Sequence, residues 1–356
     1  MQPVFLEEST PMSAQLPQPQ QTPPLDQFKR PLHDLRISVT DRCNFRCNYC
    51  MPADVFNDDF EFLPHPQILR FEEVTRLARI STTLGVRKLR ITGGEPLVRH
   101  DLPVLIEQLS QIPAVDDIAM TTNGFLLDRF AQRLKDAGLQ RITVSLDSLD
   151  NDVFRRMNGG KADVTPVLEG IRAAERAGLL PIKINAVVQR GVNDHTLVDL
   201  ARFCKDNGYI VRFIEFMDVG TRNGWKLDQV VPAKEIVEKI DAVMPLEAVD
   251  SNYYGEVAAR YRYQDGGGEI GLITSVTQPF CGSCTRLRMS PDGQIFTCLF
   301  ARKGTSLRDP MRAGASDDEL SAIMRQVWHL REDRYSEIRT EETAAQKKIE
   351  MYYIGG

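Results

Sequence analysis

Three cysteines lie within eight residues in the sequence DRCNFRCNYCMP: Cys43, Cys47 and Cys50. Thiolates bind zinc or iron–sulfur clusters, and a Cys-x-x-Cys pair can also take part in disulfide exchange. A redox pair does not need Cys43, and a structural zinc site usually has four protein ligands. Three ligands on one tight loop therefore favour a [4Fe–4S] cluster with one iron left open for chemistry.

A second set of three cysteines occurs in PFCGSCTRLRMSPDGQIFTCLF: Cys281, Cys284 and Cys298. Alone, this spacing is also compatible with a structural zinc knuckle. A fourth ligand is not evident nearby, since His329 is the closest candidate and lies in a predicted helix. We therefore expect a second three-cysteine cluster with an open iron. The seventh cysteine, Cys204, lies in an amphipathic stretch, and we expect it to be a buried, inert thiol.

Two arginines lie between the second set of cysteines. Arg286 and Arg288 alternate with Leu287 in a strand-like segment, so both point to the same face. Guanidinium groups bind phosphates in a bidentate manner. Solvent-exposed arginines would be unremarkable, but their place between cluster ligands predicts that they face the site.

The elements that position these residues alternate between strands and helices. Each predicted strand is followed by an amphipathic stretch, and several of these end at Gly85, Gly138, Gly178 or Gly208. The pattern predicts right-handed βαβ units and a parallel α/β sheet, an incomplete (βα)6 TIM-like barrel with fewer than eight strands. The predicted strands are 35–40, 87–93, 117–124, 141–147, 181–188 and 210–217.

Polar side chains alternate with apolar ones along these strands. Because the apolar face must meet the helices, the polar face lines the concave side of the sheet. That face carries Arg36, Arg90, Lys183 and, with less support, Arg212 and Asn185. Unpaired buried charges are costly, so these cations predict an open lumen that holds an anion. The alternative is salt bridging, for which the candidate partners are Glu95, Asp147 and Glu215.

Composition limits the other possibilities. The net charge of −5 gives no reason to expect nucleic acid, and no run of about 18 apolar residues exists to span a membrane. Residues 1–33 are rich in Pro and Gln, lack the features of a targeting signal, and are predicted to be a disordered tail. The charged, helical segment 303–348 is expected to cover the open side of the sheet.

The first motif resembles the signature of radical S-adenosylmethionine enzymes, and TGGEP at 92–96 resembles their glycine-rich motif. With the second cysteine set, the chain from about Asp34 to Gly356 resembles the GTP 3′,8-cyclase family of molybdenum cofactor biosynthesis. The matching stretches include DLRISVTDRCNFRCNYCMP, LRITGGEPLVR, EIGLITSVTQPFCGSCTRLRMSPDGQIFTCLF and the terminal YIGG.

The resemblance implies a role for each matching residue. The first cysteine set would hold the cluster that binds S-adenosylmethionine, and the second would hold a cluster whose open iron binds guanine. Gly355 and Gly356 would reach into the site and support catalysis together with Arg286 and Arg288. Contacts to S-adenosylmethionine would come from Tyr49, Gly94, Ser145 and Met217, and contacts to GTP from Arg36, Arg90, Thr121, Lys183, Arg286, Leu287 and Arg288.

The implied activity is conversion of GTP to (8S)-3′,8-cyclo-7,8-dihydroguanosine 5′-triphosphate. It implies two [4Fe–4S] clusters, S-adenosylmethionine, an external electron donor and transfer of the product to cyclic pyranopterin monophosphate synthase. We expect a cytoplasmic monomer or homodimer with a radical core at 34–220 and a C-terminal cluster-binding extension at 221–356. One alternative is another two-cluster radical enzyme that modifies a peptide; another is a regulatory iron–sulfur or zinc protein that binds nucleic acid.

Overall fold

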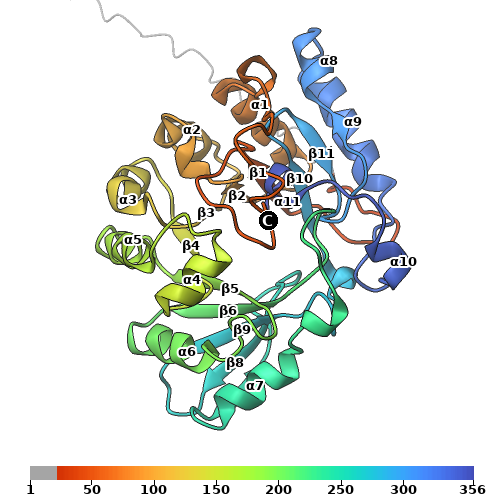
Figure 1. Cartoon of the computed structure of the whole chain (residues 1–356). Helices are drawn as coiled ribbons and strands as arrows, with labels where there is room; N and C mark the ends of the chain where they lie inside the picture. Colours follow the sequence, from red (N-terminus) through yellow and green to blue (C-terminus); the bar gives the residue numbers. More distant parts are fainter. Residues whose placement is uncertain (1–21) are drawn as a thin grey trace, which may run out of the picture.

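The computed structural model describes residues 22–356, and the strands in this range form one sheet (Figure 1). Its strand order is β12-β11-β10-β1-β2-β3-β4-β5-β6-β9-β8-β7. The strands are β1 (Asp34–Ser38), β2 (Lys88–Thr92), β3 (Asp117–Thr122), β4 (Arg141–Ser145), β5 (Ile182–Val188), β6 (Ile210–Glu215), β7 (Leu246–Val249), β8 (Ala259–Tyr263), β9 (Glu269–Ile273), β10 (Arg286–Met289), β11 (Gln294–Phe296) and β12 (Thr305–Ser306).

The six predicted strands are confirmed as β1 to β6, which pair in parallel and in sequence order. The sheet is wider than predicted because β10 adds in parallel beside β1 and β9 adds in parallel beside β6. Neither added strand belongs to a repeating strand–helix unit, so the alternation that revealed the other six did not reveal these two. The remaining strands extend both edges in antiparallel fashion.

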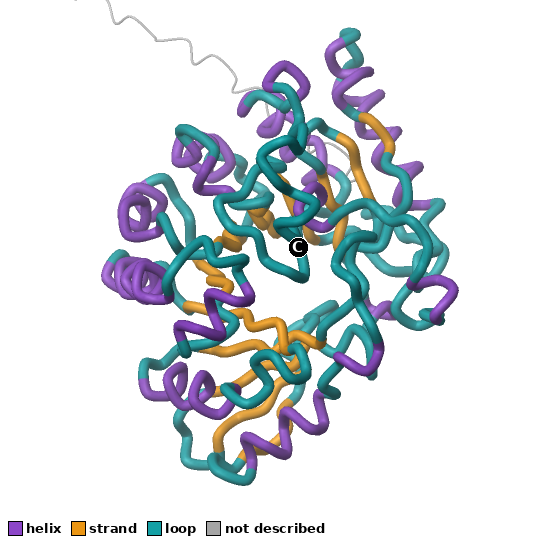
Figure 2. The backbone as a smooth tube through the Cα atoms, viewed as in Figure 1, coloured by secondary structure: helices purple, strands orange, loops and turns teal. Residues whose placement is uncertain are grey.

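Most of the helices, such as α2, α3, α5 and α6, lie outside the arc of strands, whereas α11 lies within it and loops cross its concave side (Figure 2). The amphipathic stretches predicted between the strands are α1, α2, α3, α5 and α6, whereas α4 was not predicted. The helices are α1 (Phe71–Thr83), α2 (Leu102–Ser110), α3 (Leu127–Asp136), α4 (Asn151–Met157), α5 (Val164–Arg176), α6 (Leu197–Asp206), α7 (Ala233–Asp241), α8 (Arg308–Arg312), α9 (Asp317–His329), α10 (Glu341–Ala344) and α11 (Met351–Ile354).

The predicted alternation of the strands separates the core from the lumen. Leu35 and Ile37 of β1 are almost completely buried and pack in the main hydrophobic core with the helices, whereas Arg36 points to the opposite face. Cys204 of α6 is buried in the same core, as predicted. The sheet therefore has one apolar convex face and one polar concave face.

Residues 22–33 differ from the predicted disordered tail. Arg30 and Leu32 are almost fully buried, and Asp26 accepts hydrogen bonds from the backbone N–H groups of Phe28 and Arg30 at 2.9 Å. Polar and Pro-rich composition suggested disorder, but long-range contacts with the C-terminal region order this segment. Residues 1–21, the rest of the predicted tail, lie outside the described residues.

The C-terminal region returns to the barrel. Helix α9 buries Leu320, Met324 and Trp328 and packs beside α1, while α11 contacts β1. Figure 1 shows the C-terminus near the middle of the arc of strands. The end of the chain thus lies inside the concave side of the sheet.

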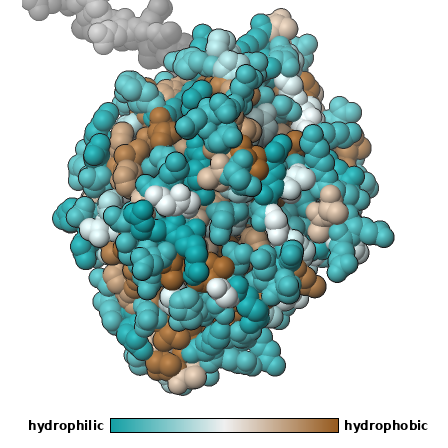
Figure 3. Space-filling view, viewed as in Figure 1, coloured by the Kyte–Doolittle hydropathy of each residue, from teal (hydrophilic) through white to brown (hydrophobic). Residues whose placement is uncertain are grey.

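The outer surface is mixed in character. In the space-filling view, hydrophilic side chains dominate and hydrophobic ones are interspersed among them (Figure 3). Within residues 22–356, no helix has the length and apolar character needed to cross a membrane.

Candidate active site

The two cysteine sets lie at opposite ends of the parallel strands. Cys43, Cys47 and Cys50 follow the carboxyl end of β1. Cys281 and Cys284 precede β10, which runs parallel to β1, so they lie at the amino end of the sheet. Cys298 follows β11, which is antiparallel to β10 and therefore returns to that same end. The five residues of β1 span about 16 Å at the usual rise per residue, which is the approximate depth of the lumen.

One cavity of about 330 Å³ connects the two ends. It is bordered by cysteines of both sets, by polar residues of the strands, and by the last residue, Gly356. Of the residues proposed from the sequence, those lining it are Arg36, Cys43, Cys47, Tyr49, Cys50, Arg90, Gly94, Thr121, Ser145, Asn185, Arg212, Met217, Cys281, Cys284, Arg286, Arg288, Cys298 and Gly356.

The first cysteine loop is held from within and by the end of α4, where the carbonyls of Met157 and Asn158 accept from the N–H groups of Asn48 and Arg46 at 3.1 Å. The guanidinium of Arg46 donates to the carbonyls of Cys43 at 2.8 Å and Phe56 at 2.6 Å. The backbone N–H groups of Cys50 and Met51 donate to the carbonyl of Cys47. These contacts fold the loop so that its three thiols face the cavity.

Burial and nearby carboxylates make the first cysteines weak acids in the free protein. Burial, then the charge of Glu95, raises the pKa of Cys43 to about 12. The pKa of Cys47 is raised by burial and by Asp147, and that of Cys50 is raised by burial, by Cys43 and by Glu350. Positive metal centres are the partners that would favour thiolates here.

The carboxylates at this end bind neutral groups. Glu95 accepts from the hydroxyl of Thr122 at 2.6 Å and the N–H of Asn123 at 2.7 Å, and burial raises its pKa to about 7. Asp147 accepts from the hydroxyl of Tyr49 at 2.9 Å, and burial raises its pKa to about 6. Glu215 accepts from backbone N–H groups of the loop 276–277.

These contacts argue against the alternative in which the lumen cations form salt bridges with Glu95, Asp147 and Glu215. Among the described residues, none of these three carboxylates forms an ion pair with a lumen cation. Arg90 instead donates to the hydroxyls of Thr121 and Thr143 at 3.2 and 3.3 Å. The lumen cations therefore have neutral partners on the protein and keep their charge available for a ligand.

The cations form a continuous row. Arg288 of β10, Arg36 of β1 and Arg90 of β2 are register neighbours on adjacent parallel strands. Burial and mutual repulsion lower their pKa values, to about 10 for Arg288, and they lower the pKa of Arg212 on β6 to about 9. Such a row is stabilised by a polyanion.

Two proposed GTP contacts lie differently from the rest. Lys183 is on the lumen face of β5, where burial and Arg212 lower its pKa to about 8, but it does not border the cavity. The side chain of Leu287 is fully buried in the hydrophobic core on the opposite face. Any contact of Leu287 with a ligand would therefore come from its backbone.

The proposed S-adenosylmethionine contacts gather at the carboxyl ends of the strands. Ser145 ends β4, Met217 follows β6, and Gly94 follows β2. A Cβ atom on Gly94 would lie 2.4 Å from the carbonyl oxygen of Arg42, so only glycine lets the cysteine loop approach this closely. These three residues thus surround the first cysteine loop.

The second cysteine set lies among arginines. Burial raises the pKa of Cys284, but the charges of Arg286 and Arg331 and their hydrogen bonds outweigh burial and lower it to about 6. The Nη2 atoms of Arg286 and Arg331 lie 3.1 and 3.0 Å from its Sγ. Burial, then the charge of Asp333, raises the pKa of Cys298 to about 12.

The donor sets fit iron–sulfur clusters better than zinc. All seven cysteines are free thiols, and His329, the candidate fourth ligand, faces the carbonyl of Leu25 rather than the second set. Within residues 22–356, no three His, Cys, Asp or Glu side chains come close enough to hold a single metal ion. In a cluster each thiolate binds a different iron, and three thiolates leave one iron open.

The C-terminal glycines lie at the cavity. The guanidinium of Arg288 donates to the carbonyl of Gly355, and Gly356 borders the cavity. Gly355 has a φ of 76°, and a Cβ atom there would lie 2.2 Å from Cγ2 of Thr92. Both features require glycine.

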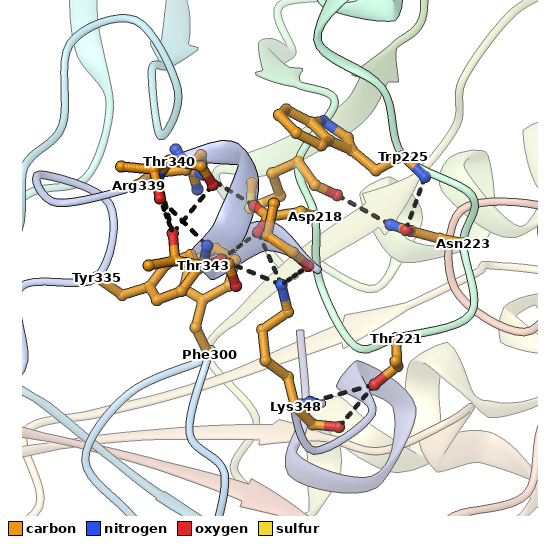
Figure 4. A network of polar contacts seen from close by, with 12 residues as sticks. Asp218, Thr221, Asn223, Trp225, Phe300, Tyr335, Arg339, Thr340, Thr343 and Lys348 are labelled. Carbon is orange, nitrogen blue, oxygen red and sulfur yellow. Dashed lines mark hydrogen bonds and ion pairs between the residues drawn. The ribbon is translucent and has the colours of Figure 1, made fainter. Parts of the chain in front are cut away.

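A buried polar network fixes the approach of this tail (Figure 4). The ammonium of Lys348 and the guanidinium of Arg339 each lie 2.8 Å from the carboxylate of Asp218, which follows Met217. The hydroxyl of Tyr335 also donates to Asp218. Burial opposes ionisation, but these partners lower the pKa of Asp218. The loop after β6 is therefore tied to the segment that carries the terminal glycines.

Some residues of the site were not found from the sequence. Lys88 and Tyr253 border the cavity, with the ammonium of Lys88 3.6 Å from the ring centroid of Tyr253. Lys88 follows the same alternation as Arg90 and could have been identified by it. Tyr253 and Arg331 lie in loops without periodicity, so only the fold shows their position.

Comparisons with known proteins cover almost the whole described chain. Residues 37–204 match the family described as Radical SAM superfamily, and residues 209–337 match Molybdenum Cofactor Synthesis C. A protein of Staphylococcus carnosus named GTP 3′,8-cyclase is 52% identical over 335 residues, covering 93% of this chain and 98% of its own. One of the same name from Acidothermus cellulolyticus is 50% identical, with the same coverage.

A solved structure supports the fold. Streptococcus suis SuiB, bound to its precursor peptide SuiA, superposes with a TM-score of 0.58 at 16% identity, covering 87% of this chain and 67% of SuiB. At this identity the likeness concerns the fold alone.

Proposed function

The chain belongs to the GTP 3′,8-cyclase family of radical S-adenosylmethionine enzymes, and we propose that its lumen holds S-adenosylmethionine at one end and GTP at the other. The activity is that of molybdenum cofactor biosynthesis: GTP becomes (8S)-3′,8-cyclo-7,8-dihydroguanosine 5′-triphosphate. One observation carries the assignment of residues. Both cysteine sets border a single cavity, and a row of arginines without carboxylate partners lies between them.

Cys43, Cys47 and Cys50 would hold one [4Fe–4S] cluster, and Cys281, Cys284 and Cys298 the second. When bound, the first cluster and S-adenosylmethionine would supply the radical chemistry that removes the C3′ hydrogen of GTP. Exclusion of water by loops over the bound substrate would protect radicals from side reactions.

The protein's own groups orient the substrate. Arg36, Arg90 and Arg288 offer neighbouring guanidinium groups to the triphosphate, and Arg286 extends the row toward the second cysteine set. The hydroxyl of Thr121 accepts a hydrogen bond from Arg90 and restrains its guanidinium group. Gly355, through its carbonyl, fixes the guanidinium of Arg288 in the same way.

The remaining parts of the proposal come from the sequence resemblance. They are an external electron donor, transfer of the product to cyclic pyranopterin monophosphate synthase, a cytoplasmic location, and a monomeric or homodimeric state.

The test uses anaerobically reconstituted protein with S-adenosylmethionine and a strong reductant. We expect 5′-deoxyadenosine that depends on GTP, together with a product of GTP mass that a Cys281→Ala variant does not form. Cleavage of S-adenosylmethionine that is indifferent to GTP would contradict the substrate assignment. A Cys281→Ala variant that still forms the product would contradict the role of the second cysteine set.

A further inference from the structure

We infer that Asp26, Arg30 and Arg331 form a buried charge cluster that positions the second cysteine set, and that Arg331 raises the reduction potential of the iron–sulfur cluster held there. The inference deepens the proposed function, because it rests on that cluster. It gives the N-terminal segment 22–33 a part in the site.

The contacts of this charge cluster converge on the cysteine backbone. Arg30 donates through Nη1 to the carbonyl of Cys281 at 2.7 Å, and Arg331 donates through Nη1 to the carbonyl of Cys284 at 2.7 Å. Asp26 joins the two arginines, at 2.6 Å from Nε of Arg30 and 3.3 Å from Nη1 of Arg331. The carbonyls of Cys281 and Cys284 are therefore held by two side chains that come from other parts of the chain, one before them and one after them.

The positive charges of this charge cluster are not fully balanced by buried carboxylates. Two guanidinium groups share one carboxylate, and the exposed fractions of the three side chains are 0% for Asp26, 0% for Arg30 and 2% for Arg331. Asp333 lies 3.5 Å from Nε of Arg331 but is 31% exposed. Nη2 of Arg30 is buried and has no hydrogen-bond partner among the described residues. With Asp333 the charges balance, so the excess of positive charge lies among the fully buried side chains of Arg30, Arg331 and Asp26. It favours a neighbouring anion, and thiolates bound to a cluster supply one.

Arg331 also contacts a ligand atom directly. Its Nη2 lies 3.0 Å from Sγ of Cys284. In the first cysteine set, Sγ of Cys43 instead accepts from neutral donors at longer distances, such as the N–H of Phe45 at 3.4 Å. Hydrogen bonds and positive charge at the sulfurs stabilise the reduced cluster, which carries one more negative charge. Arg331 therefore acts through Cys284 and is a positioning residue.

The test isolates the second cluster in a full-length protein with Cys43, Cys47 and Cys50 changed to alanine. After anaerobic reconstitution, iron and sulfide are measured, and the cluster is titrated with dithionite under electron paramagnetic resonance. Arg331→Gln is expected to keep its iron but to lower the reduced-to-oxidised ratio at fixed potential about tenfold, or about 59 mV for one electron. Arg331→Lys retains the positive charge, so the reduction potential should fall less than in Arg331→Gln.

The matched control is Arg334→Gln, which removes the same charge from the same loop at a side chain that is 48% exposed. It should leave the potential unchanged. Equal potentials in Arg331→Gln and Arg334→Gln, with full iron content, would overturn the inference. So would an Arg331→Lys variant whose potential falls below that of Arg331→Gln.

A second variant keeps the inference testable if Arg331→Gln does not fold. Asp26→Asn keeps both arginines and removes the carboxylate, so the potential should rise, in the opposite direction. A lower or unchanged potential would overturn the inference. Absence of iron from the background protein itself would instead overturn the proposed second cluster, and this inference with it.

Discussion

Cys43, Cys47 and Cys50 are arranged by a single loop whose main clamp, Arg46, lies between them. The second cysteine set is arranged by residues from remote parts of the chain, such as Arg30, which lies 251 residues before Cys281. The three ligands of the first site therefore come from one loop, although its backbone also bonds to Met157 and Asn158, whereas the second site joins segments far apart in the chain. This difference explains why the first motif is easily read from the sequence and the surroundings of the second are not.

The two sites also differ in charge. Glu95 and Asp147 lie near the first cysteines, whereas Arg286 and Arg331 contact Cys284. Negative surroundings favour the oxidised form of a cluster and make it a stronger reductant, and positive surroundings do the opposite. The arrangement suits a first cluster that gives up an electron and a second cluster that lies beside an anionic substrate.

The largest effect is expected at the first loop. Cys47→Ala removes one of three ligands and should abolish formation of 5′-deoxyadenosine, with or without GTP, because no other described thiol lies on that loop beyond Cys43 and Cys50. The measurement is 5′-deoxyadenosine by liquid chromatography. Cys204→Ala, at a thiol buried in the core, is the control and should retain the activity. Residual GTP-dependent cleavage by Cys47→Ala would contradict the assignment.

The buried contacts between Asp218 and the C-terminal segment should contribute strongly to the free energy of unfolding. Asp218→Asn leaves Lys348 and Arg339 buried without their carboxylate, and we expect a loss of about 3–5 kcal/mol in the free energy of unfolding. Urea unfolding of the metal-free protein, followed by circular dichroism, measures it.

Asp163→Asn provides the matched control for this prediction. Its ion pair with Arg155 has the same 2.8 Å distance as that of Lys348 with Asp218, but both side chains are about half exposed. It should leave the unfolding midpoint unchanged. Equal losses in the two variants would show that burial of the network is not what stabilises the C-terminal segment.

Substitution of Gly355, the penultimate residue, should affect catalysis more than folding. Gly355→Ala places a Cβ atom 2.2 Å from Thr92 and disturbs the carbonyl that accepts from Arg288. A displacement of about 1 Å in a reacting site can cost roughly 100-fold in rate, and we expect a loss of this order in product formation.

Gly160→Ala is the control that separates the effect of the close contact from the effect of the backbone conformation. Gly160 has a similar φ of 71°, but a Cβ atom there would meet nothing within 4 Å. The initial rate of product formation should therefore stay at the wild-type level. If Gly355→Ala loses no more activity than Gly160→Ala, the tail does not support catalysis through its position.

The smallest effect concerns the pH dependence of thiol alkylation in the metal-free protein. The thiolate is the reactive form, and the pKa of Cys284 is about 6, so about nine-tenths of it is ionised at pH 7. Its labelling rate should rise by only about 10% from pH 7 to 9. The pKa of Cys43 is about 12, and its rate should rise about tenfold per pH unit over the same range. Mass spectrometry of labelled peptides measures both, and parallel profiles would contradict the electrostatic difference between the sites.

Most of the parallel core could be predicted because its signals are periodic. Alternation along β1, β2 and β5 predicts Arg36, Arg90 and Lys183 as lumen residues, and all three lie on that face of the sheet. The prediction for 1–33 was wrong over 22–33, because composition cannot show that Asp26 and Arg30 find partners in the C-terminal region.

The sequence by itself determined the cysteine sets, the six strand–helix units and the basic face, because each depends on spacing between near neighbours. Only the tertiary structure decided that β9 and β10 join the parallel sheet and that the cysteine sets lie at opposite ends of one lumen. It also decided that Arg331 reaches Cys284 and that Gly355 reaches Arg288. These contacts join residues far apart in the chain, and strand pairing at the sheet edges, which leaves no periodic signal, brings them together.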